Sequence, residues 1–368
     1  MRELLDRLGE PDGTGDPGRV HEEGRVARES VELAREQVAA LACVAPRRVV
    51  FTSGATEAAN TAVASFGPGS AIFCAPVEHS CVREASARTG RLVEVGVLPD
   101  GAIDLESLGS LLGRSAGRAP VLVNCQWANH EVATVQPVEA VAELCSKAGA
   151  DLHVDAAAAF GHVPTDFGSL DAEYASVSAH KMGGPAGVGA LILGRGVRLQ
   201  PLLVGGSEER ARRAGAENLL GIVGFGAAAA ELLEEGRLAA ESVVAAGWRS
   251  ALVEIACAVE GISLLGPVDI DRSLPHIACL SIEGVLGEAV LLSLDRAGIA
   301  VHSGSACSSE ILEPSPVLEA MGVDPDSSLR LSVGWSTTEE DVVAFARVFA
   351  SAVAALRELG AAGPTPSG

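Results

Sequence analysis

The sequence contains no long hydrophobic run. No apolar stretch reaches the roughly 18 residues that a membrane-spanning helix needs. The first ten residues, MRELLDRLGE, also lack the apolar core of a secretory signal peptide. Both absences argue against a membrane protein or a secreted one, and we expect the chain to be cytoplasmic.

Positive charge and aromatic side chains are both scarce. Lys and Arg number 27 against 48 Asp and Glu, which gives a formal net charge of −21, and aromatics make up 3% of the residues. Such an acidic surface repels phosphate backbones, so direct nucleic-acid binding is not expected, whereas basic protein partners are favoured. Hydrophobic residues still make up 48%, so a sizeable core can form, mainly from Ala, Val and Leu.

Paired cysteines and a dinucleotide-binding glycine pattern are missing as well. None of the eight cysteines forms a CxxC pair or a zinc-finger spacing with histidine, and the strand-to-helix turn at 52–56 does not carry GxGxxG. Most cysteines lie in apolar stretches, where a thiol is usually a small buried hydrophobe. Cys307 differs, because it lies in HSGSACSSE, a run of small polar residues. We expect it in an exposed or mobile loop.

What the sequence does have is an alternation of apolar strands and helices. Strands are predicted at 49–53, 71–75, 92–97, 121–126, 151–157, 174–179 and 188–194, with helical patterns between most of them. This pattern predicts an α/β domain with a mostly parallel sheet covered on both faces, in which ligands collect at the carboxyl ends of strands.

The same reading gives a two-domain organisation. We predict a large domain over 15–235 and a smaller α+β domain over 236–362, with 1–14 as a candidate to pack on the smaller one. A long helix over 226–256 would link the two domains. The final residues, 363–368, have the composition of a disordered tail.

Several residues at strand ends could carry chemistry. Lys181 follows Ser-Ala-His and precedes GGPAG, and a lysine there could form a Schiff base with a carbonyl cofactor or simply be exposed. Asp155 ends a strand and could pair with a pyridinium nitrogen or cap a helix. The Ser53-Gly54-Ala55-Thr56 turn opens a helix, which suits a phosphate as well as ordinary capping.

Three further residues complete the set. His79 could stack on a planar cofactor and move protons, although a lone histidine is often structural. Arg330 lies on a predicted strand and could grip a carboxylate with two hydrogen bonds or form a surface ion pair. The third is Cys307 in its run of small polar residues.

In their joint order these residues resemble the NifS/IscS-like cysteine desulfurases of the class V aminotransferase group. The resemblance covers roughly residues 19–345 and is carried by FTSGATEAAN, VEHSCV, ANHEVATVQPV, HVDA, SAHKMGGPAGVGAL, EERARRAGAENL, SGSACSSEILEPSPVL and LRLSVGWSTTEEDV. It implies fold type I of the enzymes that use pyridoxal 5'-phosphate (PLP), with a seven-stranded type of sheet in the large domain and a smaller C-terminal domain.

The resemblance also implies residue roles. Lys181 would hold PLP, Asp155 would pair with its nitrogen, and His79 would stack on its ring. Ser53, Gly54, Ala55, Thr56, Ser178 and His180 would bind the phosphate, His130 would face the cofactor, and Asn129 and Arg330 would bind substrate. The catalytic residues would be Lys181, Cys307 and His79.

The implied reaction converts L-cysteine to L-alanine and leaves the sulfur on Cys307 as a persulfide. An iron–sulfur scaffold or a tRNA-thiolation carrier would then accept the sulfur. The family also implies a homodimer, in which segment 205–218 matches the loop that reaches the neighbouring subunit.

The chain departs from the family pattern at four places. The opening LDNAATTP-like segment is missing, His130 stands where an asparagine is common, Ala158 replaces a glutamine that donates to PLP, and Ala216 replaces a threonine that reaches the partner's phosphate. Two other interpretations stay open: a weakened homologue that acts as partner or scaffold in a sulfur-transfer assembly, and another PLP lyase such as a selenocysteine lyase.

Overall fold

The computed structural model describes residues 15–67, 69–88, 91–115, 117, 120–308 and 311–361, except for the side chains of 305–308 and 311–313. The predicted tail at 363–368 and the candidate packing segment 1–14 lie outside the described residues. The chain divides into two compact units. Unit 1 comprises the chain up to residue 96 with 103–127 and 137–239, and unit 2 comprises 97–102, 128–136 and the chain from residue 240 onward.

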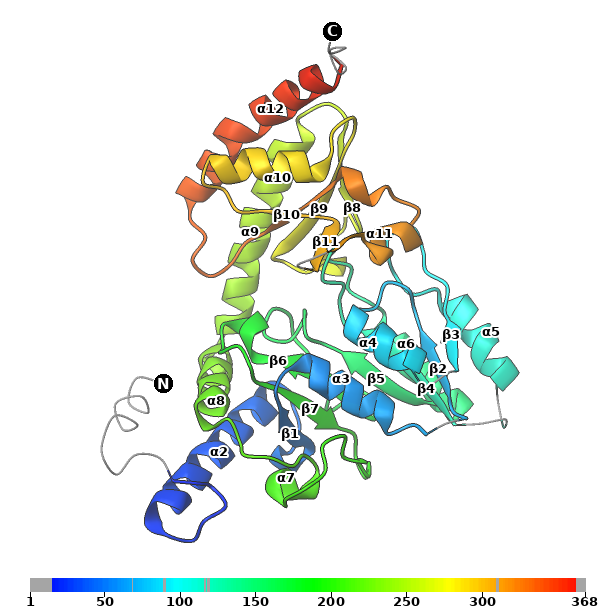
Figure 1. Cartoon of the computed structure of the whole chain (residues 1–368), viewed down its shortest axis with the longest axis vertical. Coiled ribbons are helices and arrows are strands. Elements are labelled where there is room, and N and C mark those ends of the chain that lie inside the picture. Colours follow the sequence, from blue (N-terminus) through cyan, green and yellow to red (C-terminus); the bar gives the residue numbers. More distant parts are fainter. Residues whose placement is uncertain are drawn as a thin grey trace. The chain divides into compact units, whose positions relative to one another are not determined.

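Unit 1 is built on a seven-stranded sheet with the strand order β1-β7-β6-β5-β4-β2-β3 (Figure 1). Adjacent strands from β6 to β3 pair in parallel, whereas β7 runs antiparallel to both β1 and β6. The mostly parallel α/β sheet predicted from the sequence is therefore confirmed. The strands are β1 (Val49–Thr52), β2 (Ala71–Cys74), β3 (Leu92–Glu94), β4 (Val121–Gln126), β5 (Asp151–Asp155), β6 (Tyr174–Ser178) and β7 (Gly189–Leu193).

Helices accompany this sheet, and its central strands are buried along their whole length or nearly so. Burial on both faces explains why these strands are near-continuous apolar runs. The helices of unit 1 are α2 (Glu22–Leu41), α3 (Ala55–Ala64), α4 (Ser80–Arg88), α5 (Leu105–Ser115), α6 (Val138–Ala148), α7 (Glu208–Ala211) and α8 (Leu219–Leu233), with short 3-10 turns η1 (Pro46–Arg48) and η2 (Ala179–Met182).

Two glycines permit close approaches between elements of unit 1. A Cβ at Gly226 on α8 would lie 2.5 Å from Ala34 Cα on α2, so these two helices can meet only with a glycine there. A Cβ at Gly189 on β7 would lie 2.7 Å from Gly54 Cα. The turn between β1 and α3 therefore packs directly on β7.

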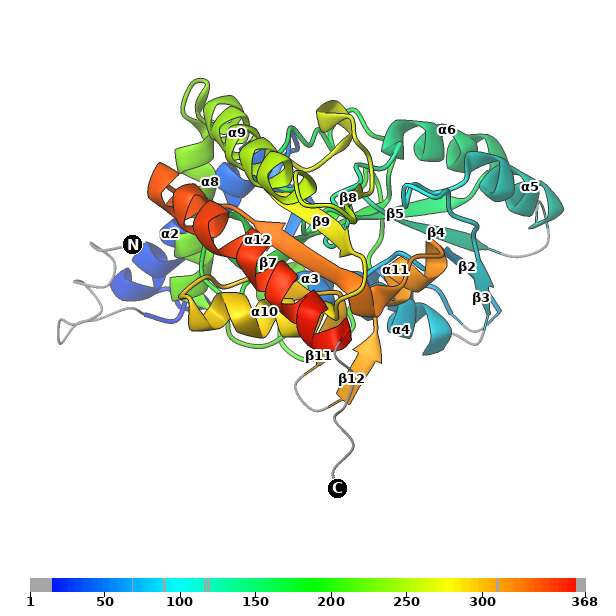
Figure 2. The same ribbon diagram turned by 90° about the horizontal axis from the view of Figure 1, so that it is seen from above.

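Unit 2 is an α+β unit around a four-stranded sheet of order β10-β13-β9-β8. Figure 2 labels its helices α9, α10 and α12 and its strands β8 and β9. Apolar residues of α9, α10 and α12 share one core with β9 and β13. Its elements are α9 (Arg237–Cys257), β8 (Ile262–Leu265), η3 (Ile270–Arg272), β9 (Ile277–Ile282), α10 (Gly287–Arg296), β10 (His302–Ser303), β11 (Ser305–Ser308), β12 (Ile311–Pro314), α11 (Pro316–Ala320), η4 (Pro325–Ser327), β13 (Ser328–Ser332) and α12 (Glu339–Ala361).

Two local predictions were wrong. The helix expected over 226–256 is two helices, because Glu234 leaves the helical region at ψ 140° and Gly236 takes a left-handed φ of 75° between α8 and α9. The loop expected around Cys307 is strand β11, which pairs antiparallel with β12. None of the helices in the described part of the chain has both the length and the apolar character that a bilayer crossing demands.

Candidate active site

The predicted cofactor residues of unit 1 come together because neighbouring strands end at the same edge of the sheet. Asp155 is the last residue of β5 and Ser178 the last of β6, and the two strands pair in parallel. Ser53 follows β1 directly and Lys181 lies in η2 just after β6. Asp155 is 7% exposed and Ser178 3% exposed, whereas Lys181 is exposed.

The turn between β1 and α3 leaves helix N–H groups available. Among the described residues no side chain caps α3, so its first amides have no such partner. Ser53 N donates to Glu57 Oε2 over 2.8 Å, and Arg213 Nε donates to Glu57 Oε1 over 3.0 Å. Burial raises the pKa of Glu57, but the bonds from Arg213 and Ser53 outweigh it and bring the pKa below its ordinary value. The turn is thus held in place while the helix end stays open to an anion.

The Ser178–Lys181 segment is fixed at both ends. The Ser178 hydroxyl and His180 Nδ1 lie 2.8 Å apart, and His162 Nε2 lies 2.7 Å from the carbonyl oxygen of Lys181, so that its N–H can donate to it. Partial burial, followed by the charge of Lys181, lowers the pKa of His180. His162 was not predicted from the sequence. Its bond to the backbone of Lys181 makes it a positioning residue for that lysine.

His79 lies at the start of α4 and its ring faces the first turn of that helix. The backbone N–H of Cys81 donates to His79 Nδ1 over 3.1 Å, and Cys81 Sγ lies 3.0 Å from the same nitrogen. Because Nδ1 accepts, the neutral ring carries its proton on Nε2. Burial and then the charge of Asp155 raise the pKa of Cys81 to about 12, so this thiol stays protonated.

Behind Asp155 lies a row of polar side chains that the sequence analysis missed. In the register of the sheet, Asn124 is opposite His153 and Asp155 is opposite Ser176, and all four are buried. His153 Nδ1 is 2.8 Å from Asn124 Oδ1, and His153 Nε2 is 3.1 Å from Ser176 Oγ. Burial lowers the pKa of His153 to about 4, against the opposing charge of Asp155. The alternation of polar residues along three predicted strands was the available signal.

A second buried carboxyl, Glu78, precedes His79. Glu78 is 2% exposed, its Oε1 accepts a bond of 2.7 Å from Gln126 N, and its Oε2 has no partner among the described residues. Burial, with a smaller contribution from the charge of Asp155, raises the pKa of Glu78 to about 8 against the lowering effect of the bond from Gln126 N. Glu78 is therefore largely protonated at neutral pH.

The predicted substrate residues belong to unit 2. Asn129 is fully buried, and its Oδ1 accepts from Glu131 N and Val132 N, both over 2.8 Å. Arg330, in the middle of β13, donates through Nη1 to the carbonyl oxygen of His130 over 3.1 Å. The His130 ring lies 3.5 Å from a Glu131 oxygen.

Glu131 is the centre of this cluster. Ser315 at the start of α11 donates to its Oε2 over 2.5 Å. Burial raises the pKa of Glu131, but the bonds from His130 and Ser315 and the charge of Arg330 bring it below its ordinary value. The cluster therefore keeps a carboxylate close to Arg330. Cys307 also belongs to unit 2, on β11, and its side chain lies outside the described residues.

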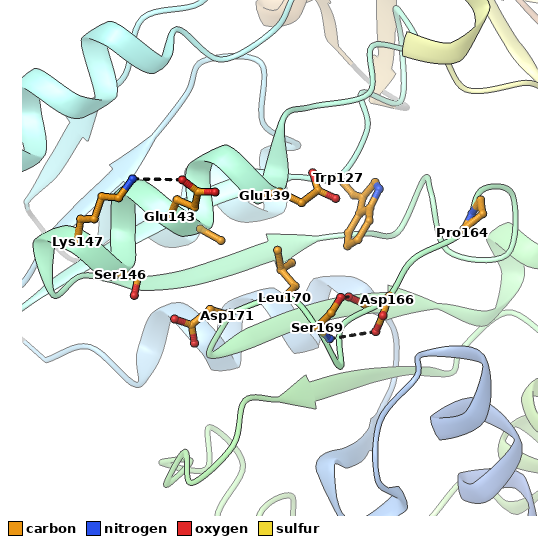
Figure 3. A pocket seen from close by; sticks show the side chains of 11 residues that line it. Trp127, Glu139, Glu143, Ser146, Lys147, Pro164, Asp166, Ser169, Leu170 and Asp171 are labelled. Carbon is orange, nitrogen blue, oxygen red and sulfur yellow. Dashed lines mark hydrogen bonds and ion pairs between the residues drawn. The ribbon is translucent and has the colours of Figure 1, made fainter.

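A pocket of about 510 Å³ lies elsewhere on unit 1, between α6 and segment 164–171 (Figure 3). Trp127 forms an apolar wall, and Lys147 and Glu143 on its rim form an exposed ion pair of 3.2 Å. None of the predicted site residues lines it.

Taken together, the residues of unit 1 suit one kind of ligand. The uncapped start of α3 and the Ser178–His180 pair offer donors to an anionic group, and the buried Asp155 offers an acceptor to a cationic nitrogen. Lys181 offers an amine in the same strand-end region. An anion, a cationic ring nitrogen and a carbonyl on one molecule would satisfy all three.

Comparison with known proteins identifies such a family. The family model described as "Aminotransferase class-V" matches residues 11–345. A cysteine desulfurase of Cereibacter sphaeroides is 38% identical over 359 residues, which cover 94% of this chain and 90% of the relative. The cysteine desulfurase IscS of Clostridium botulinum (strain Hall) is 34% identical over 345 residues, which cover 89% of this chain and 84% of the relative.

Solved structures agree with these relatives. A NifS-like protein superposes with a TM-score of 0.86 at 32% identity and covers 96% of this chain and 95% of its own. A NifS-like protein from Rickettsia africae has the same TM-score at 26% identity, and the match covers 95% of this chain and 94% of that protein.

Proposed function

This chain belongs to the class V aminotransferase family, within which it is a cysteine desulfurase, and from this premise we infer that unit 1 holds pyridoxal phosphate. The family and the PLP fold type I predicted from the motifs are thereby confirmed. The observation that carries the cofactor proposal is the buried Asp155 in the same strand-end region as the open start of α3 and Lys181.

The residues of unit 1 would hold the cofactor as follows. The amides at the start of α3, with Thr56, Ser178 and His180, bind the phosphate, and Asp155 pairs with the ring nitrogen. Lys181 would bind the carbonyl carbon covalently, and His79 would face the ring. His130, which the motifs predict to face the cofactor, belongs to unit 2. When bound, the cofactor withdraws electrons from the α-carbon of an amino acid.

Chemistry on L-cysteine then needs a base, an anchor and a sulfur acceptor. Lys181, once released, exchanges a proton with the substrate α-carbon. Arg330, with Asn129, holds the substrate carboxylate by paired hydrogen bonds. The Cys307 thiolate takes the substrate sulfur, so that L-cysteine becomes L-alanine and Cys307 becomes a persulfide. An acceptor protein, an iron–sulfur scaffold or a tRNA-thiolation carrier, receives this sulfur from a homodimer of the chain.

The lysine assignment has an unusually clean test, because the sequence contains two lysines, Lys147 and Lys181. In Lys181→Ala we expect no covalent cofactor after borohydride reduction and a loss of alanine formation of about 10²–10⁴-fold. Lys147→Ala, which removes an exposed lysine paired with Glu143, is the matched control and should keep both. Covalent label on Lys147, or full turnover by Lys181→Ala, would contradict the assignment.

The nucleophile is tested in the same assay. Cys307→Ser should bind the cofactor as the wild type does but form no persulfide and no more than background alanine from L-cysteine. Cys257→Ser, at an exposed cysteine of unit 2, is the control and should be active. Full desulfuration by Cys307→Ser would instead point to a lyase that needs no enzyme thiol.

A substitution at Ala158 tests how tightly the cofactor is bound. It follows β5 in the turn that supplies Ala157 N–H to Asp155 Oδ1, and it is partly buried. Restoring a donor with Ala158→Gln should tighten cofactor binding by about tenfold, since one hydrogen bond in such a site contributes on the order of 1–3 kcal/mol. The measurement is cofactor dissociation by equilibrium dialysis, and unchanged affinity would mean that this position does not face the cofactor.

A further inference from the structure

A continuous chain of hydrogen-bonding groups runs through the interior of unit 1 from α4 to Asp155. Its five contacts join Val82 O to Ser86 Oγ at 2.7 Å, Ser86 Oγ to Asn124 Nδ2 at 3.2 Å, Asn124 Oδ1 to His153 Nδ1 at 2.8 Å, His153 Nε2 to Ser176 Oγ at 3.1 Å, and Ser176 Oγ to Asp155 Oδ1 at 3.1 Å. Ser86, Asn124, His153 and Ser176 are each 0% exposed, so water cannot complete the chain.

Both ends of the chain are acceptors. At one end the Val82 carbonyl has no proton to give, and at the other the Asp155 carboxylate also accepts from Ala157 N over 3.0 Å. The groups between them bring one proton each to the five contacts: the Ser86 hydroxyl, the Asn124 amide, the neutral His153 imidazole and the Ser176 hydroxyl. Four protons therefore serve five contacts. Exchanging the Oδ1 and Nδ2 positions of Asn124 does not supply the missing proton. Ser86 would then face two acceptors, Val82 O and Asn124 Oδ1, with one hydroxyl proton.

A contact left without a proton would place two lone pairs face to face in a buried site. An unsatisfied buried group of this kind is costly, and the cost rises in a low-dielectric interior. One additional proton removes the conflict in either of two ways. It can sit on His153 Nε2 beside an ionised Asp155, or on Asp155 Oδ1 beside a neutral His153.

We propose that this chain holds one additional proton, shared through the Ser176 hydroxyl between His153 and Asp155, and that His153 is thereby a positioning residue for Asp155. The two arrangements interconvert by a balanced shift. As the Nε2 proton passes to Ser176 Oγ, the hydroxyl proton passes to Asp155 Oδ1, and the total charge is unchanged. Neither arrangement leaves Asp155 as a free carboxylate with an incomplete hydrogen-bond shell.

The groups around His153 and Asp155 indicate which of the two arrangements is favoured without a cation beside Asp155 and which with one. Burial of His153 favours the proton on Asp155 when no cation is near. Glu78 and Cys81 are titratable groups of the described residues whose pKa the charge of Asp155 raises when Asp155 is ionised, so a proton on Asp155 removes that effect. A cationic ring nitrogen beside Asp155 would move the proton to His153. The proton count depends on the fold alone, whereas its consequence for catalysis rests on the proposed function.

The test measures where the protons are, in the full-length chain freed of cofactor at pH 7. Ring-15N histidine labelling reports whether His153 has one or two N–H groups, with His153→Gln used to assign its signals. The infrared carbonyl stretch that disappears in Asp155→Asn reports whether Asp155 is protonated. We expect a protonated Asp155, and a doubly protonated His153 would also support the proposal. An ionised Asp155 beside a singly protonated His153 would overturn it.

Variants separate the proton chain from simple packing. Ser176→Ala should leave His153 with one N–H and Asp155 ionised, whereas Ser176→Thr, which keeps the hydroxyl, should behave as the wild type. Val154→Ala is the control, because Val154 is equally buried and lies between His153 and Asp155 on the opposite face of β5. It should lower stability without moving a proton. Ser176→Ala with an unchanged proton on Asp155 or His153 would also overturn the proposal. Because neither readout uses L-cysteine, a failure of the proposed desulfurase roles would leave this result standing.

Discussion

At the scale of single residues, this protein keeps several ionisable groups away from water around one strand edge. Asp155, His153 and Glu78 are all buried, and the charge of Asp155 acts to raise the pKa of both Glu78 and His153. Glu78 differs from the other two, because within the described part of the chain no side chain donates to it and a backbone N–H of Gln126 is its one hydrogen-bond donor. The contribution of Glu78 to the free energy of unfolding therefore depends on whether its carboxyl group is protonated.

Glu78 should make the protein less stable as the pH rises. Its folded-state pKa of about 8 lies above the ordinary value of 4.5, so the folded state binds a proton that the unfolded state has lost between these values. Stability from this group is present below about pH 4.5 and is lost as the pH approaches 8. Relative to Glu78→Gln, the wild type should lose about 1.4 kcal/mol per pH unit in this window. Urea unfolding at several pH values measures it, and parallel curves for the two proteins would contradict it.

At the scale of elements, one buried ion pair joins segments far apart in the sequence. Arg35 on α2 donates to both oxygens of Glu209 on α7, over 2.8 and 2.7 Å, and to the carbonyl oxygen of Val49 on β1. Glu209 Oε2 also accepts from Phe51 N over 3.0 Å. Glu209 and the two residues after it have left-handed φ values of 48°, 61° and 60°. The pair therefore holds a strained stretch of segment 205–218 against the start of the sheet.

Breaking this pair should be far more costly than breaking an exposed one. Arg35→Met leaves the Glu209 carboxylate buried and unpaired, and we expect a loss of about 3–5 kcal/mol. Arg210→Met is the matched control, since its partner Glu32 and its own side chain are 43% and 53% exposed, and its loss should stay within about 0–1 kcal/mol. Denaturant unfolding compares the two variants. Similar losses would show that the buried pair does not hold the segment.

At the scale of the whole molecule, the net charge of −21 affects assembly. Two copies of so acidic a chain repel one another, and salt screens that repulsion. If the chain forms the proposed homodimer, light scattering should give twice the chain mass of 37.4 kDa, and the dimer fraction should rise with salt. A monomer that still converts L-cysteine at full rate would contradict the dimer proposal.

The sequence by itself determined the class of fold and the family. Apolar runs such as AIFC and VLVNCQ indicate strands that are buried on both faces, which is typical of parallel sheets, so the mostly parallel sheet was predictable from their composition. The motifs around Lys181 and Asp155 follow strands directly, so their place at the strand ends was also predictable. Local turn geometry was less so, because the break at Gly236 interrupts an otherwise helical composition.

Only the tertiary structure decided which polar groups meet. Asn124, His153 and Ser176 come from three strands, and their contacts depend on a register that no single strand specifies. Arg35 and Glu209 are 174 residues apart, and the burial of Glu78 depends on the strands packed around it. Composition and motif order are properties of the chain, whereas proton affinity and ion pairing depend on distance and dielectric, and these exist only after folding.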